Sequence, residues 1–479
     1  MNVKEEFNIS QRKISFKKKH SLLFFILFPA LAMLLGWGLR GFIGGGPYGA
    51  MIPGAMVILS ICMLLDVPPA FAAIAVVFGT AGTAMGGEMT YGQTIGFLRN
   101  PATVWWGFAG TSIKGGVWGL ISGLFIGLGL VHRRIKTQTI ITGFLIFLIG
   151  FVIGIKLIND PKILYFSDPF NHPRKESWAG LLLGAIGLLG YLKIKAGNED
   201  FRIVVRFASY GLIGGALGFG LGSLWITVGV QYGAHFLIID WWKMMEFSFG
   251  LLLGGSLGYA AWRSNNIDKN FDRKMPVKIN KSFASELMFT IILGLFIYAA
   301  LPLLESYLET INKNDGVLYG LLATIGRVIV SYTFIGSLLI IIALRRPYLA
   351  FQIAITFTFC HTMIDLATDT KLFPGLQSSP FIIAFIIIAA SLIIALLVAM
   401  FQRKQLVLKS MFLILVWSTI AVAILRMFVH ADFHFSQGHS LIQIIMGDMF
   451  VFNVFVLSAI AVSAMVIKNK TFQIPISAL

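Results

Sequence analysis

Long apolar stretches, each followed by a short polar segment, run along almost the whole chain. A helix needs about 20 apolar residues to cross roughly 30 Å of hydrocarbon. The stretches lie at 21–45, 48–65, 67–87, 103–131, 139–157, 177–192, 207–230, 243–262, 284–304, 316–344, 348–367, 380–401, 410–430 and 440–467. Because backbone polar groups find no water inside lipid, a single spanning segment satisfies them only as a helix. We therefore predict an all-α polytopic membrane protein with about fourteen transmembrane helices.

The stretch 105–131 carries a regular row of glycines. Gly115, Gly119, Gly123 and Gly127 recur at every fourth position, so on a helix they form one bare stripe. Each such glycine would weaken a helix in water by about 1 kcal/mol relative to alanine. In a bilayer, however, small residues allow two helix backbones to approach closely. The GxxxG row therefore predicts a close contact between two helices.

Glycine also divides the chain into two unequal parts. Residues 1–283 contain 42 of the 50 glycines, and a polar segment at 263–283 ends this part. We predict five consecutive units: a cytoplasmic segment at 1–20, a Gly-rich eight-helix membrane module at 21–262, a cytoplasmic linker at 263–283, a six-helix membrane module at 284–467 and a cytoplasmic tail at 468–479.

An internal repeat is visible within the Gly-rich part. The run Glu-Ser-Trp-Ala-Gly-Leu-Leu-Leu-Gly from Glu176 resembles the run Glu-Phe-Ser-Phe-Gly-Leu-Leu-Leu-Gly from Glu246. We therefore expect 139–192 and 207–262 to be two copies of one helical hairpin. Looser glycine-rich echoes in the earlier stretches extend this to four related hairpins around an axis along the membrane normal, an arrangement found in transporters. The alternative is that Gly-rich membrane helices resemble one another through composition alone.

The distribution of charge agrees with a membrane topology. The chain is 57% hydrophobic and 12% charged, whereas soluble proteins carry about 25% charged residues. With the N-terminus placed inside, the inner segments contain 26 of the 38 Lys and Arg residues, and the outer segments contain seven. This asymmetry follows the positive-inside rule and predicts an inner (plasma) membrane protein with both termini in the cytoplasm. The net charge of +17 then reflects topology, and no nucleic-acid partner is expected.

Two basic residues lie near the middle of predicted spans, where a charge costs at least about 2.5 kcal/mol. Lys114 and Arg327 each lie about eleven residues inside their stretch, roughly 16 Å along a helix. They could act as counter-ions for an anionic substrate. The alternative is that each side chain snorkels towards the interface or bonds to a backbone carbonyl.

Four further charged residues complete the predicted substrate-binding set. Arg40 and Glu88 occupy matching places at the outer ends of the first and third spans, where they could pair with each other. Glu176 and Glu246 head the two copies of the repeat and lie at a similar depth. Tryptophans gather on the same side, and they form either an aromatic belt or a platform for a sugar or lipid headgroup.

The C-terminal module carries a separate group of titratable residues. His361, Asp365 and Asp369 are spaced by four, so they share one face if the helix continues that far, and Arg426 and His430 are also spaced by four. The segment after His430 adds Asp432 and His434. Imidazole and carboxylate groups could bind a metal ion or relay protons in a transporter. The remaining interpretation is an ordinary polar outer surface.

No signature sequence identifies an activity. The chain has no Walker, GxSxG or HExxH sequence, and Cys62 and Cys360 form no CxxC pair. No cofactor is therefore expected, and the predicted partners are the lipid bilayer and a small-molecule or lipid-linked substrate. We expect a secondary carrier or flippase-like transporter for a small anionic or sugar-containing substrate. The alternatives are a membrane-embedded acyl or glycosyl transferase-like enzyme with an outward-facing His/Asp site, and a structural or channel subunit.

Overall fold

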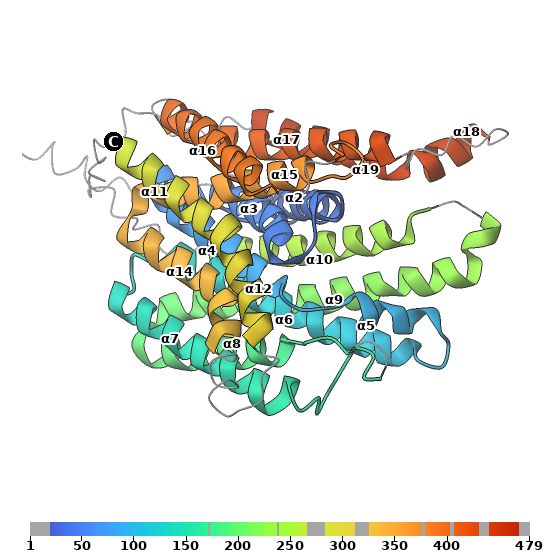
Figure 1. Cartoon of the computed structure of the whole chain (residues 1–479), viewed down its shortest axis with the longest axis horizontal. Helices are drawn as coiled ribbons and strands as arrows, with labels where there is room; N and C mark the ends of the chain where they lie inside the picture. Colours follow the sequence, from blue (N-terminus) through green and yellow to red (C-terminus); the bar gives the residue numbers. More distant parts are fainter. Residues whose placement is uncertain are drawn as a thin grey trace, which may run out of the picture.

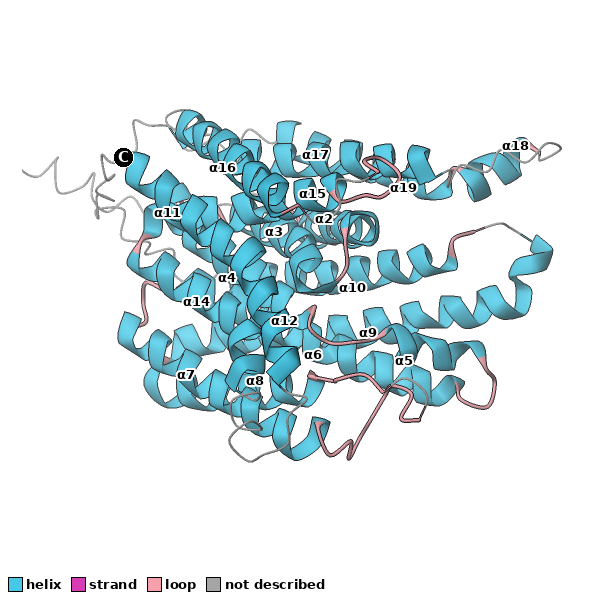
Figure 2. Cartoon of the chain, in the orientation of Figure 1, coloured by secondary structure: helices cyan, strands magenta, loops and turns pink. Residues whose placement is uncertain are grey.

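The structure is a computed structural model that describes residues 20–170, 173–236, 239–265, 283–311, 325–374, 379–402, 407–430 and 440–468. Every regular element in these residues is a helix, and none of them forms a strand (Figure 2). The prediction of an all-α polytopic membrane protein is confirmed. The predicted N-terminal segment, most of the linker and nearly all of the C-terminal tail lie outside the described residues.

The Gly-rich half contains a helix for each predicted stretch. Its elements are α2 (Leu22–Ile43), α3 (Gly46–Leu64), α4 (Pro69–Gly86), α5 (Gly92–Gly96), the 3-10 turn η1 (Phe97–Arg99), α6 (Val104–Val131), α7 (Thr137–Gly154), its π-helical continuation η2 (Ile155–Asn159), α8 (Trp178–Lys195), α9 (Asn198–Phe236) and α10 (Trp241–Ser264). Helix α9 extends well beyond both ends of the stretch 207–230. Proline stands in the first turn of α3 and of α4, where its missing N–H breaks no helical hydrogen bond.

The C-terminal half is more interrupted. It contains α11 (Phe283–Leu295), the π-helical turn η3 (Phe296–Ala300), α12 (Leu301–Ile311), α14 (Tyr332–Arg345), the 3-10 turn η4 (Pro347–Leu349), the π-helical turn η5 (Gln352–Thr356), α15 (Phe357–Ala367), α16 (Pro380–Gln402), α17 (Val407–His430), α18 (Leu441–Gln443), the π-helical turn η6 (Ile444–Asp448) and α19 (Phe450–Lys468). Three of the four π-helical turns among the described residues lie in this half.

Eleven helices in the described residues are long and apolar enough to cross a membrane. All fourteen predicted stretches contain helix, but α10, α14 and α15 are not among these eleven. Helix α14 has only 14 residues, and η5 interrupts the helical segment before α15. Helix α10 is long enough, but Lys243 and Glu246 in its first turns make it more polar.

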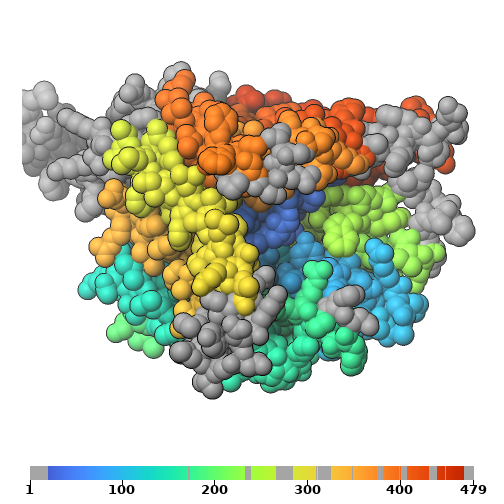
Figure 3. Space-filling view, viewed as in Figure 1, coloured from blue at the N-terminus to red at the C-terminus, as the bar shows by residue number. Residues whose placement is uncertain are grey.

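Most of the helices form three layers, and α11 and α12 run obliquely across them (Figure 1). Helices α2, α3, α4 and α10 lie in the middle. Helix α2 packs against α3 and α10, and α4 packs against α3 and against α6 of the next layer. Helices α6 to α9 lie on one side, and α15, α16, α17 and α19 lie on the other. Figure 3 shows the N-terminal helices, in blue, between the orange and red C-terminal helices and the green and cyan helices of the Gly-rich half. The earliest spans therefore form the centre of the molecule.

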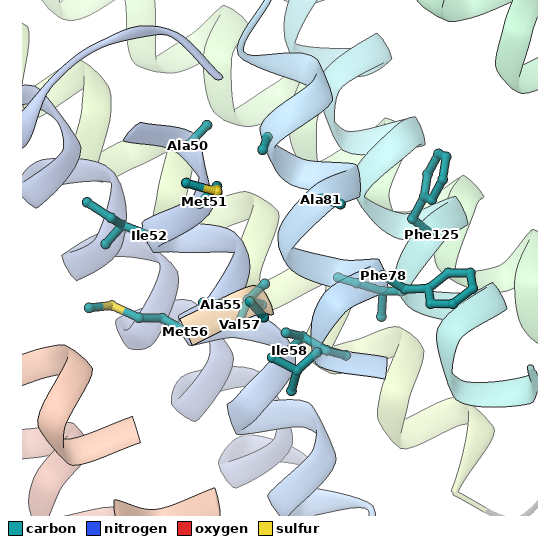
Figure 4. Close-up of a cluster of buried hydrophobic side chains, with 14 of the residues drawn as sticks. Ala50, Met51, Ile52, Ala55, Met56, Val57, Ile58, Phe78, Ala81 and Phe125 are labelled. Atoms are coloured by element: carbon teal, nitrogen blue, oxygen red, sulfur yellow. The ribbon is translucent and has the colours of Figure 1, made fainter. Parts of the chain in front are cut away.

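Burial differs strongly from helix to helix. About 89% of the apolar window of α3, and of α6, is buried inside the protein, compared with 28% for the span Ala284–Leu308. Aliphatic side chains of α3 such as Ile58 belong to one buried apolar cluster with Phe78 of α4 and Phe125 of α6 (Figure 4). The outer helices instead expose large apolar side chains, for example Phe381 and Phe385 of α16, as expected for surfaces that contact lipid.

Helices α6 and α9 touch backbone to backbone. A Cβ atom built on Gly119 would overlap the carbonyl oxygen of Gly211, and one built on Gly211 would overlap that of Gly119. The same reciprocal relationship joins Gly115 to Gly215. Any larger residue at these positions would push the two helices apart, so the glycine stripe of α6 lies at a helix–helix contact and not against lipid.

The two similar hairpins pair their glycines with different neighbours. In α8, a Cβ on Gly184 would lie 2.7 Å from the carbonyl oxygen of Phe147 in α7, its own hairpin partner. In α10, Gly254 instead packs against Pro29 of α2. Similar sequences therefore support different packing, because α10 lies beside the central helix α2 while α8 lies at the periphery.

Candidate functional site

A buried ion pair joins α6 to the segment that precedes α8. Lys114 is 1% exposed, and its Nζ donates to Glu176 Oε1 at 2.8 Å, to the Thr90 carbonyl at 2.6 Å and to Thr94 Oγ1 at 2.8 Å. An ammonium group has three hydrogens, so every donor of Lys114 has an acceptor. Two predicted substrate-binding residues, Lys114 and Glu176, are thus brought together, but in this arrangement Lys114 offers no free donor to a substrate.

The Glu176 carboxylate is held equally closely. It accepts from Ser167 Oγ at 2.9 Å, from the Phe166 backbone N–H at 3.2 Å and from Trp178 Nε1 at 3.2 Å. Phe166 and Ser167, from the segment after η2, and Trp178, at the start of α8, therefore surround one buried charge. The repeat residue Glu176 therefore anchors the segment before α8 onto α6.

Its counterpart Glu246 pairs with a residue of its own helix. Lys243 Nζ donates to Glu246 Oε2 at 2.5 Å and to the Gly38 carbonyl of α2 at 3.1 Å. Both side chains are nearly fully buried, at 6% and 5% exposure. Lys243, the first residue of the predicted stretch 243–262, was not among the predicted site residues, so its buried role was missed. The i,i+3 spacing of Lys243 and Glu246, which places them on one helix face, was the signal that could have revealed it.

Arg40 is buried near the C-terminal end of α2. Its guanidinium donates to Tyr91 Oη at 2.6 Å and to the Gly46 carbonyl at 3.3 Å. It also lies 5.2 Å from the ring centre of Trp37 and 5.4 Å from that of Trp118, within the range of cation–π attraction. Arg40 therefore lies in an aromatic cage.

Glu88 has no contact with Arg40 and instead links the two halves of the chain. Its carboxylate accepts from the Thr333 backbone N–H at 2.8 Å and from Thr333 Oγ1 at 2.6 Å. Thr333 lies in the first turn of α14, where unpaired N–H groups and the helix dipole favour an anion. The predicted pairing of Arg40 with Glu88 is therefore wrong, because each has a partner on a different element.

Arg327 lies in a different network from Lys114. It donates to Asp160 Oδ1 at 2.9 Å, and Lys156 donates to Asp160 Oδ2 at 2.9 Å. Burial alone would raise the pKa of Asp160, but the hydrogen bonds from Lys156 and Arg327 outweigh it and hold the pKa below its ordinary value. The two cations predicted to lie mid-span thus have separate carboxylate partners, and the structure does not bring them to one shared site.

The titratable residues of α15 and α17 do meet. Arg426 forms ion pairs with Asp365 and, through Nε at 3.0 Å, with Asp369. His430 Nε2 lies 2.7 Å from Asp369 Oδ2. Arg426 also donates to the Phe42 carbonyl at 2.6 Å, near the C-terminal end of α2, where a cation is favoured. Asp365 of α15, Asp369 just beyond the end of α15, and Arg426 and His430 of α17 therefore form one cluster, the α15–α17 cluster, which also contacts the Gly-rich half.

Asp369 is the carboxylate of this cluster that is held by the most hydrogen bonds. Burial would raise its pKa, but the hydrogen bond with His430 and those from the backbone N–H groups of Leu372 and Lys371, together with the nearby Arg426 charge, lower the pKa to about 2. Asp369 is therefore a stable anion at neutral pH.

His361 is placed beside this cluster but does not join its ion pairs. Its ring lies 5.7 Å from that of Tyr48 and 6.5 Å from that of Tyr298, and its buried Nε2 has no hydrogen-bond partner in the described residues. Asp432 and His434 lie outside the described residues. Within the described ranges, no group of three or more His, Cys, Asp and Glu residues could hold a metal ion.

The geometry thus places the predicted site residues in six separate networks. They are Lys114 with Glu176, Glu246 with Lys243, Arg40 with its aromatic cage, Glu88 with Thr333, Arg327 with Asp160, and the α15–α17 cluster. Comparisons with known proteins add no further assignment to any of them. No protein-family model, curated protein or solved structure matches this chain.

Proposed function

We propose that this protein is a transporter, a secondary carrier or flippase-like protein, that moves a small anionic or sugar-containing substrate across the inner membrane, with both termini in the cytoplasm. Alternating access requires one body of helices to move against another. The observation that carries the proposal is the difference between the packing inside the Gly-rich half and the packing across the seam, meaning the contact between this half and the C-terminal helices.

Inside the Gly-rich half, backbone meets backbone. The α6–α9 contact at Gly119 and Gly211 leaves no space for a side chain, so these helices form a rigid unit. Across the seam, the contacts involve side chains. Glu88 bonds to Thr333 and Arg426 to the Phe42 carbonyl. Aromatic rings also pack there, Phe28 on Phe412 and Phe42 on Phe455. Contacts of this kind can be exchanged between two arrangements more readily than an interlocked backbone contact.

The interruptions of the C-terminal helices also support motion there. The turns η3, η5 and η6 are π-helical, and π-helical turns inside longer helices are frequent at functional sites and bends. We place substrate recognition along the seam, with Arg327 and the α15–α17 cluster on its C-terminal side and Arg40 and Glu88 on the other. In this proposal the buried ion pairs of Lys114, Glu176 and Glu246 hold the helices of the Gly-rich half together. Protons are relayed by His361, Asp365 and His430.

The motion is tested by distance measurements between spin labels. One label pair, at Leu217 of α9 and Leu392 of α16, crosses the seam, and a control pair, at Leu217 and Ile186 of α8, lies within the Gly-rich half. All three side chains are exposed. In proteoliposomes we expect two distance populations for the first pair and one for the control. A single population for both pairs would contradict alternating access between these bodies.

Transport itself is tested by uptake into the same proteoliposomes. The probes are radiolabelled carboxylates, phosphate esters and hexoses, each measured with and without an imposed pH gradient. Protein-dependent accumulation of one class is expected. If no class accumulates and the spin-label distances do not change, the transporter proposal fails.

The enzyme alternative rests on the 2.7 Å contact between His430 and Asp369. A carboxylate that orients an imidazole is a common acid–base arrangement. Here the same carboxylate also pairs with Arg426, which gives it a structural role. Turnover of lipid-linked substrates that is lost in His430→Gln, with no uptake, would favour the enzyme.

A further inference from the structure

One face of α9 changes from charged to apolar along its length. Arg202, Arg206, Tyr210, Ile213 and Leu217 follow one another at intervals of three or four residues, so they form one stripe along the helix. Arg202, Ile213 and Leu217 are exposed, and Arg206 and Tyr210 are half-buried. The stripe therefore runs from cations through an aromatic ring to apolar side chains at the outside of the protein.

Helix α10 runs antiparallel to α9 and repeats this order beside it. Arg206 Nη1 donates to the carbonyl of the exposed Arg263 at 2.8 Å, and the rings of Tyr210 and Tyr259 lie 5.0 Å apart. Farther along α10, Leu252 packs beside α9 and is 39% exposed. The two helices thus share one surface, the α9–α10 surface, on which cations, aromatic rings and apolar side chains follow one another.

The charged end of this surface carries three arginines and no carboxylate partner for them. Arg202, Arg206 and Arg263 form no ion pair within the described part of the chain, and the charges of Arg202 and Arg263 both repel that of Arg206. The sequence of 266–282, which follows α10, has five Lys and Arg residues and two Asp residues, so it adds further positive charge. An anion bound at this end would relieve the repulsion.

The aromatic side chains indicate the level of the membrane surface. Tyr259 stacks on Trp262 with ring centres 5.8 Å apart, and tyrosine and tryptophan are enriched at the level of lipid headgroups. One turn beyond Tyr210 lies Arg206, and one turn in the other direction lies Ile213, which is 49% exposed. The surface therefore has the same order of groups as a phospholipid, whose phosphate precedes its acyl chains.

We propose that the α9–α10 surface is a binding site for an anionic phospholipid such as phosphatidylglycerol. The headgroup would lie against Arg202 and Arg263, and the acyl chains would follow Ile213, Leu217 and Leu252. Basic side chains at the ends of membrane helices recognise anionic lipid in this way. The bound lipid would hold the ends of α9 and α10 together. The site does not depend on the proposed transport function and would exist equally in an enzyme.

The test uses the full-length protein in a non-ionic detergent. Thermal unfolding is followed during titration with phosphatidylglycerol, with phosphatidylcholine of the same acyl chains, and with glycerol phosphate. We expect a saturable rise in Tm of about 2 °C or more with phosphatidylglycerol alone. Equal rises with the two lipids would show that the anionic headgroup is not recognised, and an equal rise with glycerol phosphate would assign the site to a free phosphate. Either result would overturn the proposal.

Two double variants locate the effect. Arg202→Gln/Arg263→Gln removes both exposed cations of the surface and should raise the apparent Kd for phosphatidylglycerol about tenfold or more, because two charge contacts to the headgroup are lost. The matched control Arg345→Gln/Lys468→Gln removes the same charge from exposed side chains of α14 and α19 and should leave the Kd unchanged. If both double variants weaken binding equally, the lipid responds to the basic surface as a whole. If neither does, it binds elsewhere, and in both cases the assignment to α9 and α10 is wrong.

Discussion

Lys114 and Glu176 are 62 residues apart in the chain, yet their side chains meet at 2.8 Å with each only 1% exposed. The pair lies between α6 and the segment that leads into α8. Each partner is the main reason that the other can remain charged there, because an isolated buried charge is far more costly than a paired one.

Removal of one partner of this pair should therefore be severe. We expect Lys114→Met or Glu176→Gln to lower the free energy of unfolding by about 3–5 kcal/mol, measured by thermal or denaturant unfolding in detergent. The double variant Lys114→Met/Glu176→Leu should recover part of the loss, because it leaves no unpaired charge.

The control for this experiment is Lys156→Met. Lys156 pairs with Asp160 at a similar distance of 2.9 Å, but the two side chains are 47% and 33% exposed. Exposed pairs contribute about 0–1 kcal/mol. If the single Lys114 and Glu176 variants were no less stable than this control, burial of the pair would have no energetic consequence.

The contact between α6 and α9 makes a prediction about glycine. Gly119→Leu should reduce stability by at least about 1–3 kcal/mol, the cost of overpacking, because even a Cβ would overlap the Gly211 carbonyl. Gly190→Leu in α8 is the matched control, since a Cβ there meets nothing within 4 Å. Equal melting temperatures for the two variants would mean that separating α6 from α9 costs no free energy.

Asp369 predicts a dependence on pH. Its pKa is held at about 2, below the ordinary value of 3.8, so its ionised form stabilises the folded protein. This contribution is complete above about pH 4 and disappears as the pH falls towards 2. The difference in Tm between wild type and Asp369→Asn should therefore be constant from pH 7 to pH 4 and shrink below it. A difference that persists unchanged at pH 2 would contradict the assignment.

The topology can be tested with two cysteine variants. Phe170, before α8, is 89% exposed, and Ile194, in the last turn of α8, is 77% exposed. On intact cells, a membrane-impermeant maleimide should label Phe170→Cys but label Ile194→Cys only after permeabilisation. The wild-type protein serves as the blank because Cys62 and Cys360 are both buried. Equal labelling from outside would show that α8 does not span the membrane in the predicted direction.

The sequence by itself determined the helices and much of their order. Spans as long as Val104–Val131 are specified locally, because apolar residues in lipid must satisfy their own backbone. The four-residue spacing of His361 and Asp365, and of Arg426 and His430, placed each set on one face through helix geometry alone. These inferences need no knowledge of which helix lies beside which.

The tertiary structure alone decided which charges meet. Arg40 lies among aromatic rings and not beside Glu88, and Arg327 pairs with Asp160 and not with a site near Lys114. Likewise, Gly184 of α8 packs on its own hairpin while Gly254 of α10 packs on α2, although their sequences are similar. Periodicity gives the direction in which a side chain leaves its helix, but its partner depends on how distant helices assemble, and that is set by the packing of all the layers together.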